Sequence, residues 1–286
     1  MHARKIIIGV AAALAVIPAG TAFAATIIGG PLGENLRGTR APDHIDGNGG
    51  NDRIHGFGAN DVLIGGPGND RVFGGRGDDT ISGVQGNDWL NGGPGNDTVT
   101  GDANGTGDLT SFDRIFGGGG NDLLKGGDSR DRISGGPGDD TSYGETGNDR
   151  MNGGTGNDVQ YGGEGNDTIF ANIGQDTTYG ENGNDTLWAL ARSDVQPDAS
   201  GVDPNGDSLD GGAGDDTFRT RDGEVDNITC GDGNDTALLD TVDVITDATA
   251  TNPNGSCERV VRQAPKPRDS KTEDAQQAPK DAQVQN

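Results

Sequence analysis

The chain has 286 residues, of which 54 are glycine, and only 29% are hydrophobic. Its 46 acidic residues outnumber 21 Lys and Arg residues, which gives a formal net charge of −25. This composition excludes an ordinary globular domain, because too little apolar surface is available to offset the entropy of ordering the chain. The remaining possibilities are disorder, a repeat architecture with a thin core, or a fold whose carboxylates are neutralised by bound cations. The charge also argues against nucleic acid and anionic membrane surfaces as partners.

The N-terminal segment has the features of a secretory signal peptide. Arg4 and Lys5 precede an apolar run over residues 6–17, and small residues suited to cleavage follow at 22–24. About a dozen apolar residues are too few to span a bilayer, so we expect no membrane insertion. The sequence predicts a signal peptide over residues 1–24 and an extracellular mature protein.

The rest of the chain repeats in units of nine residues. Residues 65–73 read GGPGNDRVF, and residues 74–82 read GGRGDDTIS. Aspartate holds the sixth position in all twenty units, from Asp43 to Asp235. Six units run unbroken over residues 47–100 and eight over 117–188, whereas longer units occupy residues 101–116, 189–210 and 220–229.

Each unit predicts one turn and one short strand. The first six positions are rich in glycine, which accepts the positive φ angles and close approaches of a tight turn. The last three positions carry one apolar residue between variable ones, which is typical of a strand that points one side chain inward. Ile45, Ile54 and Leu63 begin this inward series. The core is therefore expected to be only one or two side chains thick.

These units resemble the nonapeptide G-G-x-G-x-D-x-U-x of the RTX (repeats-in-toxin) family. The resemblance implies an all-β, right-handed parallel β-roll with two nonapeptides per turn. It also implies calcium ions between turns, held by Asp carboxylates and backbone carbonyls of loops one full turn apart. Ala59, Ser129 and Arg130 depart from the loop pattern, and the longer units are not expected to form complete loops. The residues that the resemblance assigns to calcium are Asp52, Asp61, Asp70, Asp79, Asp88, Asp97, Asp122, Asp140, Asp149, Asp158, Asp167, Asp176 and Asp185.

Ligand chemistry favours the same ion. Carboxylates and carbonyls are hard oxygen donors that suit the flexible shell of Ca²⁺, whereas Mg²⁺ prefers a tighter octahedron and zinc prefers His or Cys. The alternative is that these aspartates only stabilise turns. Because stacked carboxylates repel and the core is thin, we expect multiple calcium ions to be required for folding.

Two rows of outward side chains suggest an alternative function. Arg53, Arg71, Trp89, Arg114, Arg132 and Arg150 should align on one sheet if residues 101–116 count as one unit. Tyr143, Tyr161 and Tyr179 should align on the other, where the inward positions are Ser142, Gln160 and Thr178. Either polar side chains line the core there and the tyrosines point outward, or that sheet inverts; we favour the outward orientation. An aromatic or arginine ladder would suit a carbohydrate-binding or adhesive module with an extracellular glycan or protein partner.

Catalysis has little support in the sequence. The histidines are His2, in the predicted signal peptide, and His44 and His55, on repeat strands. No zinc-protease, serine-hydrolase or Cys–His motif is present. The sequence therefore predicts a structural or interaction protein rather than an enzyme.

Cys230 and Cys257 are the only cysteines, and an even number in an exported chain favours a disulfide over zinc. After residue 262 the chain becomes polar without apolar periodicity, which is typical of a disordered tail. The predicted organisation is a signal peptide over 1–24, an N-terminal cap over 25–37, a calcium-binding roll over 38–238 with insertions near 101–112 and 190–206, a C-terminal cap over 239–261, and the tail over 262–286.

Overall fold

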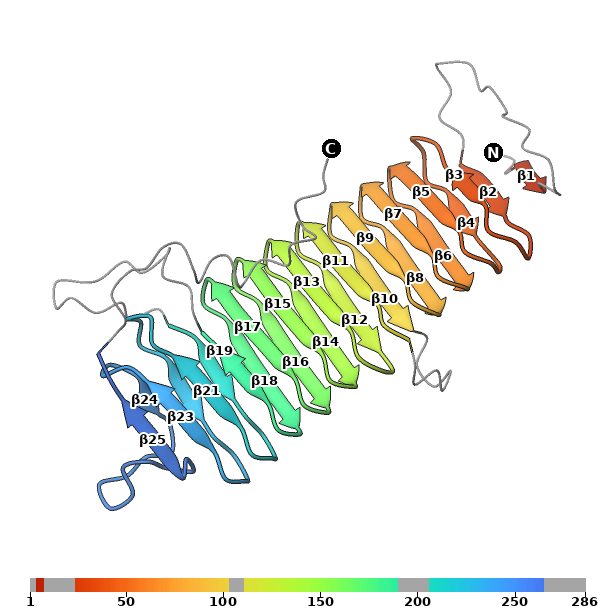
Figure 1. Ribbon diagram of the computed structural model, residues 1–286. Coiled ribbons are helices and arrows are strands. Elements are labelled where there is room, and N and C mark those ends of the chain that lie inside the picture. Colours follow the sequence, from red (N-terminus) through yellow and green to blue (C-terminus); the bar gives the residue numbers. More distant parts are fainter. Residues whose placement is uncertain (1–3, 8–23, 103–110, 190–205, 265–286) are drawn as a thin grey trace.

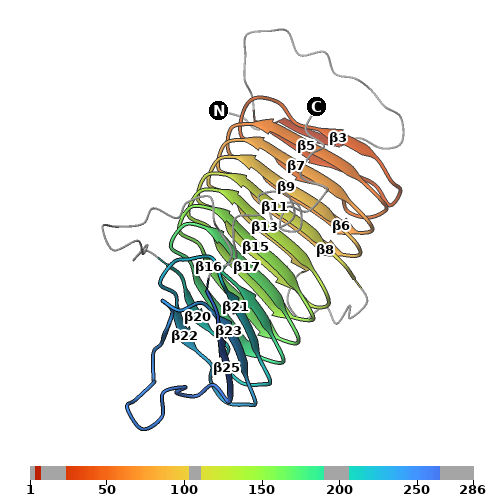
Figure 2. The same cartoon turned by 60° about the vertical axis from the view of Figure 1, so that its left-hand side comes forward.

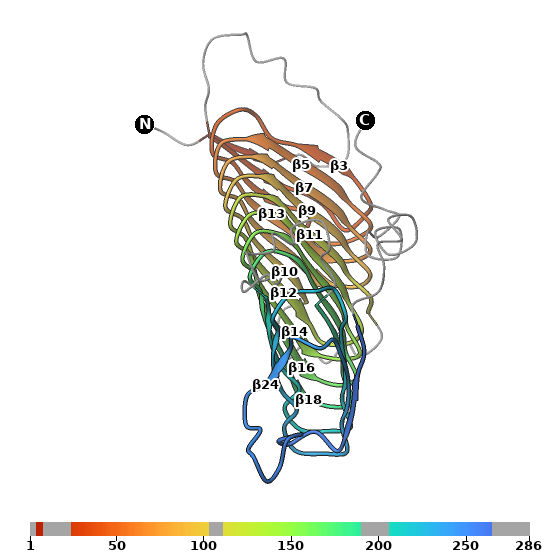
Figure 3. The same cartoon turned by 90° about the vertical axis from the view of Figure 1, so that its left-hand side faces the viewer.

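The computed structural model describes residues 4–7, 24–102, 111–189 and 206–264, and every regular element in these residues is a β-strand. The strands stack along one axis, from the N-terminal end to the C-terminal end (Figure 1). They form a 13-stranded sheet and a 12-stranded sheet, and neighbouring strands of the described residues pair in parallel. Figure 3, seen from the C-terminal end, shows the turns stacked behind one another, so the molecule is a parallel β-roll.

The chain alternates between the two sheets. The 13-stranded sheet contains β1 (Arg4–Ile7), β2 (Ala25–Ile28), β4 (His44–Asp46), β6 (Val62–Pro67), β8 (Thr80–Gln85), β10 (Thr98–Asp102), β12 (Leu123–Gly127), β14 (Thr141–Thr146), β16 (Val159–Glu164), β18 (Thr177–Asn182), β20 (Ser208–Asp210), β22 (Asn227–Thr229) and β24 (Val244–Ile245). The 12-stranded sheet contains β3 (Asn35–Arg37), β5 (Arg53–Gly58), β7 (Arg71–Arg76), β9 (Trp89–Pro94), β11 (Arg114–Gly119), β13 (Arg132–Pro137), β15 (Arg150–Thr155), β17 (Thr168–Ile173), β19 (Thr186–Trp188), β21 (Thr217–Thr220), β23 (Thr236–Leu239) and β25 (Arg259–Arg262).

The register follows the repeat. In the unbroken blocks, residues one turn apart differ by 18, as between Asp52 and Asp70. The first long unit preserves the phase, because Trp89 pairs with Arg114 as predicted. The two predicted insertions fall between β10 and β11 and between β19 and β20, and residues 103–110 and 190–205 lie outside the described residues.

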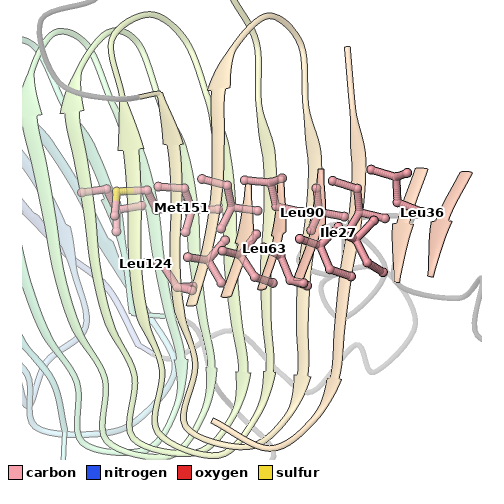
Figure 4. Close-up of a cluster of buried hydrophobic side chains, with 14 residues drawn as sticks. Ile27, Leu36, Leu63, Leu90, Leu124 and Met151 are labelled. Atoms are coloured by element: carbon pink, nitrogen blue, oxygen red, sulfur yellow. The ribbon is translucent and has the colours of Figure 1, made fainter. Parts of the chain in front are cut away.

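The core consists of two rows of side chains, one from each sheet, that occupy the eighth position of the repeat. Fourteen buried residues from Ile27 to Ile169 form one continuous cluster, and Ile45, Ile54 and Leu63 have no exposed surface. Figure 4 shows this cluster as a narrow band between the two sheets. Each turn contributes one side chain from each sheet, which confirms the predicted thin core.

A polar stretch interrupts this core between β14 and β18. Ser142, Gln160 and Thr178 are 3%, 0% and 1% exposed, respectively. The neighbouring Tyr143 and Tyr161 stack on the outer surface, with ring centroids 4.9 Å apart. The outward orientation of the tyrosines is therefore correct, and polar side chains line the core at these turns.

The two ends of the roll continue the sheets. Residues 25–37 contribute β2 and β3, which pair with the first repeat strands. At the other end, residues 239–261 contain β24, and Cys230 and Cys257 form the predicted disulfide with their Cα atoms 5.2 Å apart. Figure 2 shows this C-terminal end in blue. None of the described residues forms a helix long and apolar enough to cross a bilayer.

A single substitution tests the backbone geometry of the turns. Ala59 occupies a glycine position of its unit and has a φ angle of 73°. Replacing it with glycine should raise the free energy of unfolding by about 1 kcal/mol, because an L-residue pays a steric cost in this region. Ala213→Gly is the control: Ala213 does not have a positive φ, so the change should destabilise the protein by about 0.5–1 kcal/mol. Chemical denaturation in saturating calcium measures both values, and a loss of stability in Ala59→Gly would contradict this reading of the turn.

Candidate metal centre

The sixth-position aspartates form one row along each edge of the roll. All thirteen aspartates assigned from the sequence lie in these rows, and seven further sixth-position aspartates extend them. Row A contains Asp52, Asp70, Asp88, Asp113, Asp131, Asp149, Asp167, Asp185, Asp216 and Asp235. Row B contains Asp43, Asp61, Asp79, Asp97, Asp122, Asp140, Asp158, Asp176, Asp207 and Asp226.

One oxygen of each carboxylate connects successive turns. Asp70 Oδ1 accepts a hydrogen bond from the Asp52 N–H at 2.7 Å, and Asp88 Oδ1 accepts one from the Asp70 N–H at 2.7 Å. The same bond spans the long units, where Asp113 Oδ1 accepts from the Asp88 N–H at 2.8 Å. This bond fixes the orientation of every carboxylate, so the second oxygen also faces a defined direction.

That second oxygen, Oδ2, is buried. Asp52, Asp61, Asp70, Asp79, Asp88, Asp97, Asp122, Asp131, Asp140, Asp149, Asp158, Asp167 and Asp185 each have an Oδ2 atom that makes no hydrogen bond within the described part of the chain. An ionised oxygen removed from water without a partner is strongly unfavourable. The rows therefore present a regular series of strong acceptors that require a counter-charge.

Backbone oxygens converge on the same places. A Cβ atom added to Gly162, a first-position glycine, would lie 2.5 Å from Asp167 Oδ2 and 2.6 Å from the Gly180 carbonyl oxygen of the next turn. A carboxylate oxygen and a carbonyl oxygen thus approach one small space that only glycine leaves open. These are hard donors of the type that calcium prefers, and the residues present fit this ion.

Burial makes the carboxylates poor acids. It raises the pKa of Asp88 and of Asp131 to about 9, and that of Asp149 to about 8. The carboxylates of adjacent turns add to this effect, while the N–H group bound to each carboxylate partly opposes it. In the folded protein these carboxyl groups are either protonated or paired with a cation. At neutral pH they can remain ionised only when a cation is bound.

The loops that depart from the repeat pattern still position their carboxylates. Ala59 and Ser129 adopt φ angles of 73° and 80°, like the glycines that they replace. Their aspartates, Asp61 and Asp131, keep the hydrogen bonds of the rows at 2.7–2.8 Å. The two rows of carboxylates therefore continue through the loops that depart from the repeat pattern.

A second ladder at the fifth position was not recognised from the sequence. Asn51 Oδ1 accepts a hydrogen bond from the Asn69 N–H at 2.9 Å, and Asn69 Oδ1 accepts one from the Asn87 N–H at 2.8 Å. Asp78 and Asn96 continue the same pattern on the other edge at 2.9 Å. The signal was present as a recurring Asn or Asp directly before each sixth-position Asp.

Both rows end on hydrogen bonds from the protein. At the N-terminal end, Asp43 Oδ2 accepts from the Thr39 N–H, and Glu34 Oε2 accepts from the Gly30 N–H at 2.7 Å. At the C-terminal end, Glu258 Oε2 accepts from the Asp235 N–H at 2.7 Å and so extends row A. Glu34 and Glu258 lie outside the repeat motif, and sequence reasoning missed them both.

The fold and the two rows define a calcium-binding β-roll. The family model for the RTX calcium-binding nonapeptide repeat matches residues 28–63, 55–90, 73–104, 110–142, 131–160, 143–177 and 152–187. The chain belongs to this family, as its resemblance to the RTX nonapeptide implied. None of the curated proteins compared with the chain matches it.

The raised pKa values predict a pH response that calcium reverses. Without calcium, burial raises the pKa of Asp70 to about 6 and that of Asp88 to about 9. An acid with a raised pKa in the fold stabilises that fold below its unfolded pKa, and the contribution is lost as the pH rises through the folded pKa. In chelator, strand content should therefore increase as the pH falls from about 8 to about 5.

With calcium bound, the sign changes. The ion favours the ionised carboxylates and lowers their pKa, so the stabilisation is present above the unfolded pKa and is lost as the pH falls through the acid range. Circular dichroism melting curves across this pH range, in chelator and in millimolar calcium, should have opposite slopes. Parallel slopes would show that the carboxylates are not the groups that calcium stabilises.

Proposed function

We propose that this protein is a secreted, non-catalytic structural β-roll that calcium holds in its folded state. The observation that supports this proposal is the series of buried Oδ2 atoms that lack hydrogen bonds within the described residues, each beside a first-position glycine. The thirteen aspartates assigned from the sequence are its proposed ligands, together with Asp131 and carbonyl oxygens of the adjacent loops. The chemistry that the ion supplies is electrostatic, because it neutralises carboxylates that successive turns bring together.

The proposed division of the chain follows the same logic. Residues 38–238 form the calcium-binding roll, and residues 25–37 and 239–261 close its two ends. The tail proposed for residues 262–286 falls mostly beyond residue 264, where the described part of the chain ends. A calcium site with a dissociation constant of ~0.1 mM stabilises the folded state by about 1.4 kcal/mol in ~1 mM calcium. Several such sites therefore decide whether a roll with a thin core folds.

The histidines support a structural role. His55 stacks on Phe73 with ring centroids 4.5 Å apart, and its Nε2 accepts a hydrogen bond from Arg53 Nε at 3.0 Å. His44 is exposed on β4. Both side chains lie on the outer faces of strands, and neither is positioned beside a nucleophile in these contacts.

The geometry does not favour the alternative of a carbohydrate-binding strip. Tyr161 stacks between Tyr143 and Tyr179 at 4.9 Å on each side, and Lys125 Nζ lies 5.7 Å from the centre of the Tyr143 ring. Neighbouring rings thus cover both faces of Tyr161 and one face each of Tyr143 and Tyr179. In the arginine row, Arg150 lies over Phe170 at 4.4 Å. These contacts fit rows that stabilise the outer faces of the sheets.

Secretion is supported by the position of Ala25. Its backbone nitrogen lies 2.6 Å from Asp43 Oδ1, at the first carboxylate of row B. Removal of residues 1–24 would turn this amide into an ammonium group, which would form an ion pair with Asp43. β1 would leave with the signal peptide, and β2 would become the edge of its sheet. We expect the intact mass of the exported protein to begin at Ala25; a mass that retains residues 1–24 would contradict the signal peptide.

The central test is calcium-dependent folding. The mature protein should be largely unfolded in excess EGTA, fold cooperatively as millimolar calcium is added, and bind several ions per chain. Replacing Asp149, Asp158 and Asp167 with alanine should raise the calcium midpoint several-fold, because the change removes ligands from adjacent turns on both edges. Circular dichroism gives the midpoint, and calorimetry gives the number of ions.

Thr168, Thr177 and Thr186 provide a matched control. They follow the sixth-position aspartates on the outer faces of β17, β18 and β19. Changing all three to serine should barely move the calcium midpoint. Strand content and melting temperature that do not change in excess EGTA would refute calcium as the stabilising ion.

A further inference from the structure

The segment before β22 departs from the nonapeptide pattern. The step from Asp207 to Asp226 in row B is 19 residues rather than 18. Thr220 occupies the place of the first-position glycine, since it extends β21 and pairs with Leu239. The extra length brings two acidic residues, Asp222 and Glu224, into the loop. In the regular units the corresponding positions hold glycine or a variable residue.

Three carboxylates meet in this part of the roll. Asp207, Glu224 and Asp226 are 1%, 2% and 0% exposed. Each offers a carboxylate oxygen, and these oxygens all lie within 4.8 Å of one another. They come from the loops before β20 and β22, so the cluster bridges two successive turns of the 13-stranded sheet.

Asp226 provides a second, independent observation. Its Oδ1 accepts a hydrogen bond from the Asp207 N–H at 2.8 Å, whereas its buried Oδ2 makes no hydrogen bond within the described residues. Burial disfavours the ionised form of Asp226, and so do its acidic neighbours Asp222, Asp243 and Asp207. An ionised oxygen in such surroundings requires a cation.

Asp243 differs from Asp226 because both of its carboxylate oxygens have hydrogen-bond donors. Its Oδ2 accepts hydrogen bonds from the Thr220 hydroxyl at 2.6 Å and from the Asp240 N–H at 2.8 Å. Its Oδ1 lies 3.3 Å from the Asp226 nitrogen. Thr220, the residue that replaces the usual glycine, therefore positions the neighbour of Asp226.

We propose that Asp207, Glu224 and Asp226 form a calcium site in which side-chain carboxylates take the role that backbone carbonyls have in the repeat loops. Glu224 is its distinguishing ligand, because no nonapeptide position provides it. Calcium affinity rises with the number of charged ligands, so this site should bind more tightly than the repeat sites. It joins the turns of β20 and β22 at the N-terminal ends of these two strands.

The test removes the charge of Glu224 in the complete mature protein. Glu224→Gln should bind one calcium ion fewer than the wild type by native mass spectrometry, and calcium titration against a chromophoric chelator should show that the missing ion belongs to the tightest class. Glu164→Gln is the control, because Glu164 is exposed and loses the same charge. It should retain the wild-type number of ions. Circular dichroism in saturating calcium establishes that both variants are folded.

A measurement on the wild type decides the matter if Glu224→Gln does not fold. Europium(III) substituted for calcium should show a minor excitation band from a site with more negative ligands, since the energy of its lowest transition depends on ligand charge. A single band overturns the proposal, as does an unchanged ion count and affinity in folded Glu224→Gln. The inference rests on the proposed calcium-dependent function, but its failure is distinguishable: a wild-type protein that binds no calcium refutes both, whereas unchanged binding in Glu224→Gln refutes this site alone.

Discussion

Each turn of the roll places a carboxylate directly against the carboxylate of the turn before it. Strands of a sheet lie about 4.8 Å apart, and the Oδ1 bond from Asp52 to Asp70 fixes the side chains at that spacing. The repulsion cannot relax, because rotating the side chain away would leave an N–H group without its acceptor. A divalent cation bound to the second oxygen would relieve the repulsion without disturbing the hydrogen bond of the first. The net charge of −25 adds to this repulsion, which either protonation or bound cations would reduce.

Two series of hydrogen bonds that run in opposite directions connect the loops of successive turns. At the sixth position, each Asp Oδ1 accepts from the preceding turn, as Asp70 accepts from Asp52. At the fifth position, each Asn Oδ1 accepts from the following turn, as Asn51 accepts from Asn69. The inner ladder is buried and charged, and the outer ladder is exposed and mostly neutral. Successive turns are therefore connected at the loops as well as through the strands, which explains why a core of one side chain per strand suffices to set the register.

Repetition determined what could be predicted from the sequence. The nine-residue period predicted which side chains point inward, and the alternation of side chains along a strand predicted that Tyr161 points outward. The spacing of the sixth-position aspartates predicted that Arg114 follows Trp89 in its row, across the first insertion. The fifth-position ladder was overlooked because Asn is also a common turn former, so its recurrence had a simpler explanation. The roles of Glu34, Glu224 and Glu258 were not predicted for a different reason. Each lies where the repeat is broken, and its role depends on which neighbouring turn is present rather than on local sequence.

The ends of the roll explain why these exceptions exist. An ion between turns needs a loop on both sides, and the terminal turn has a neighbour on one side only. At the N-terminal end, the N–H groups of Thr39 and Gly30 donate hydrogen bonds to the carboxylates of Asp43 and Glu34. At the C-terminal end, Thr220 donates a hydrogen bond to Asp243, and Glu258 supplies the last acceptor of row A. The C-terminal end also carries the disulfide. The covalent link between Cys230 and Cys257 ties the last strands to the roll, and a loop of this length contributes about 3–4 kcal/mol to the free energy of unfolding by limiting the unfolded chain.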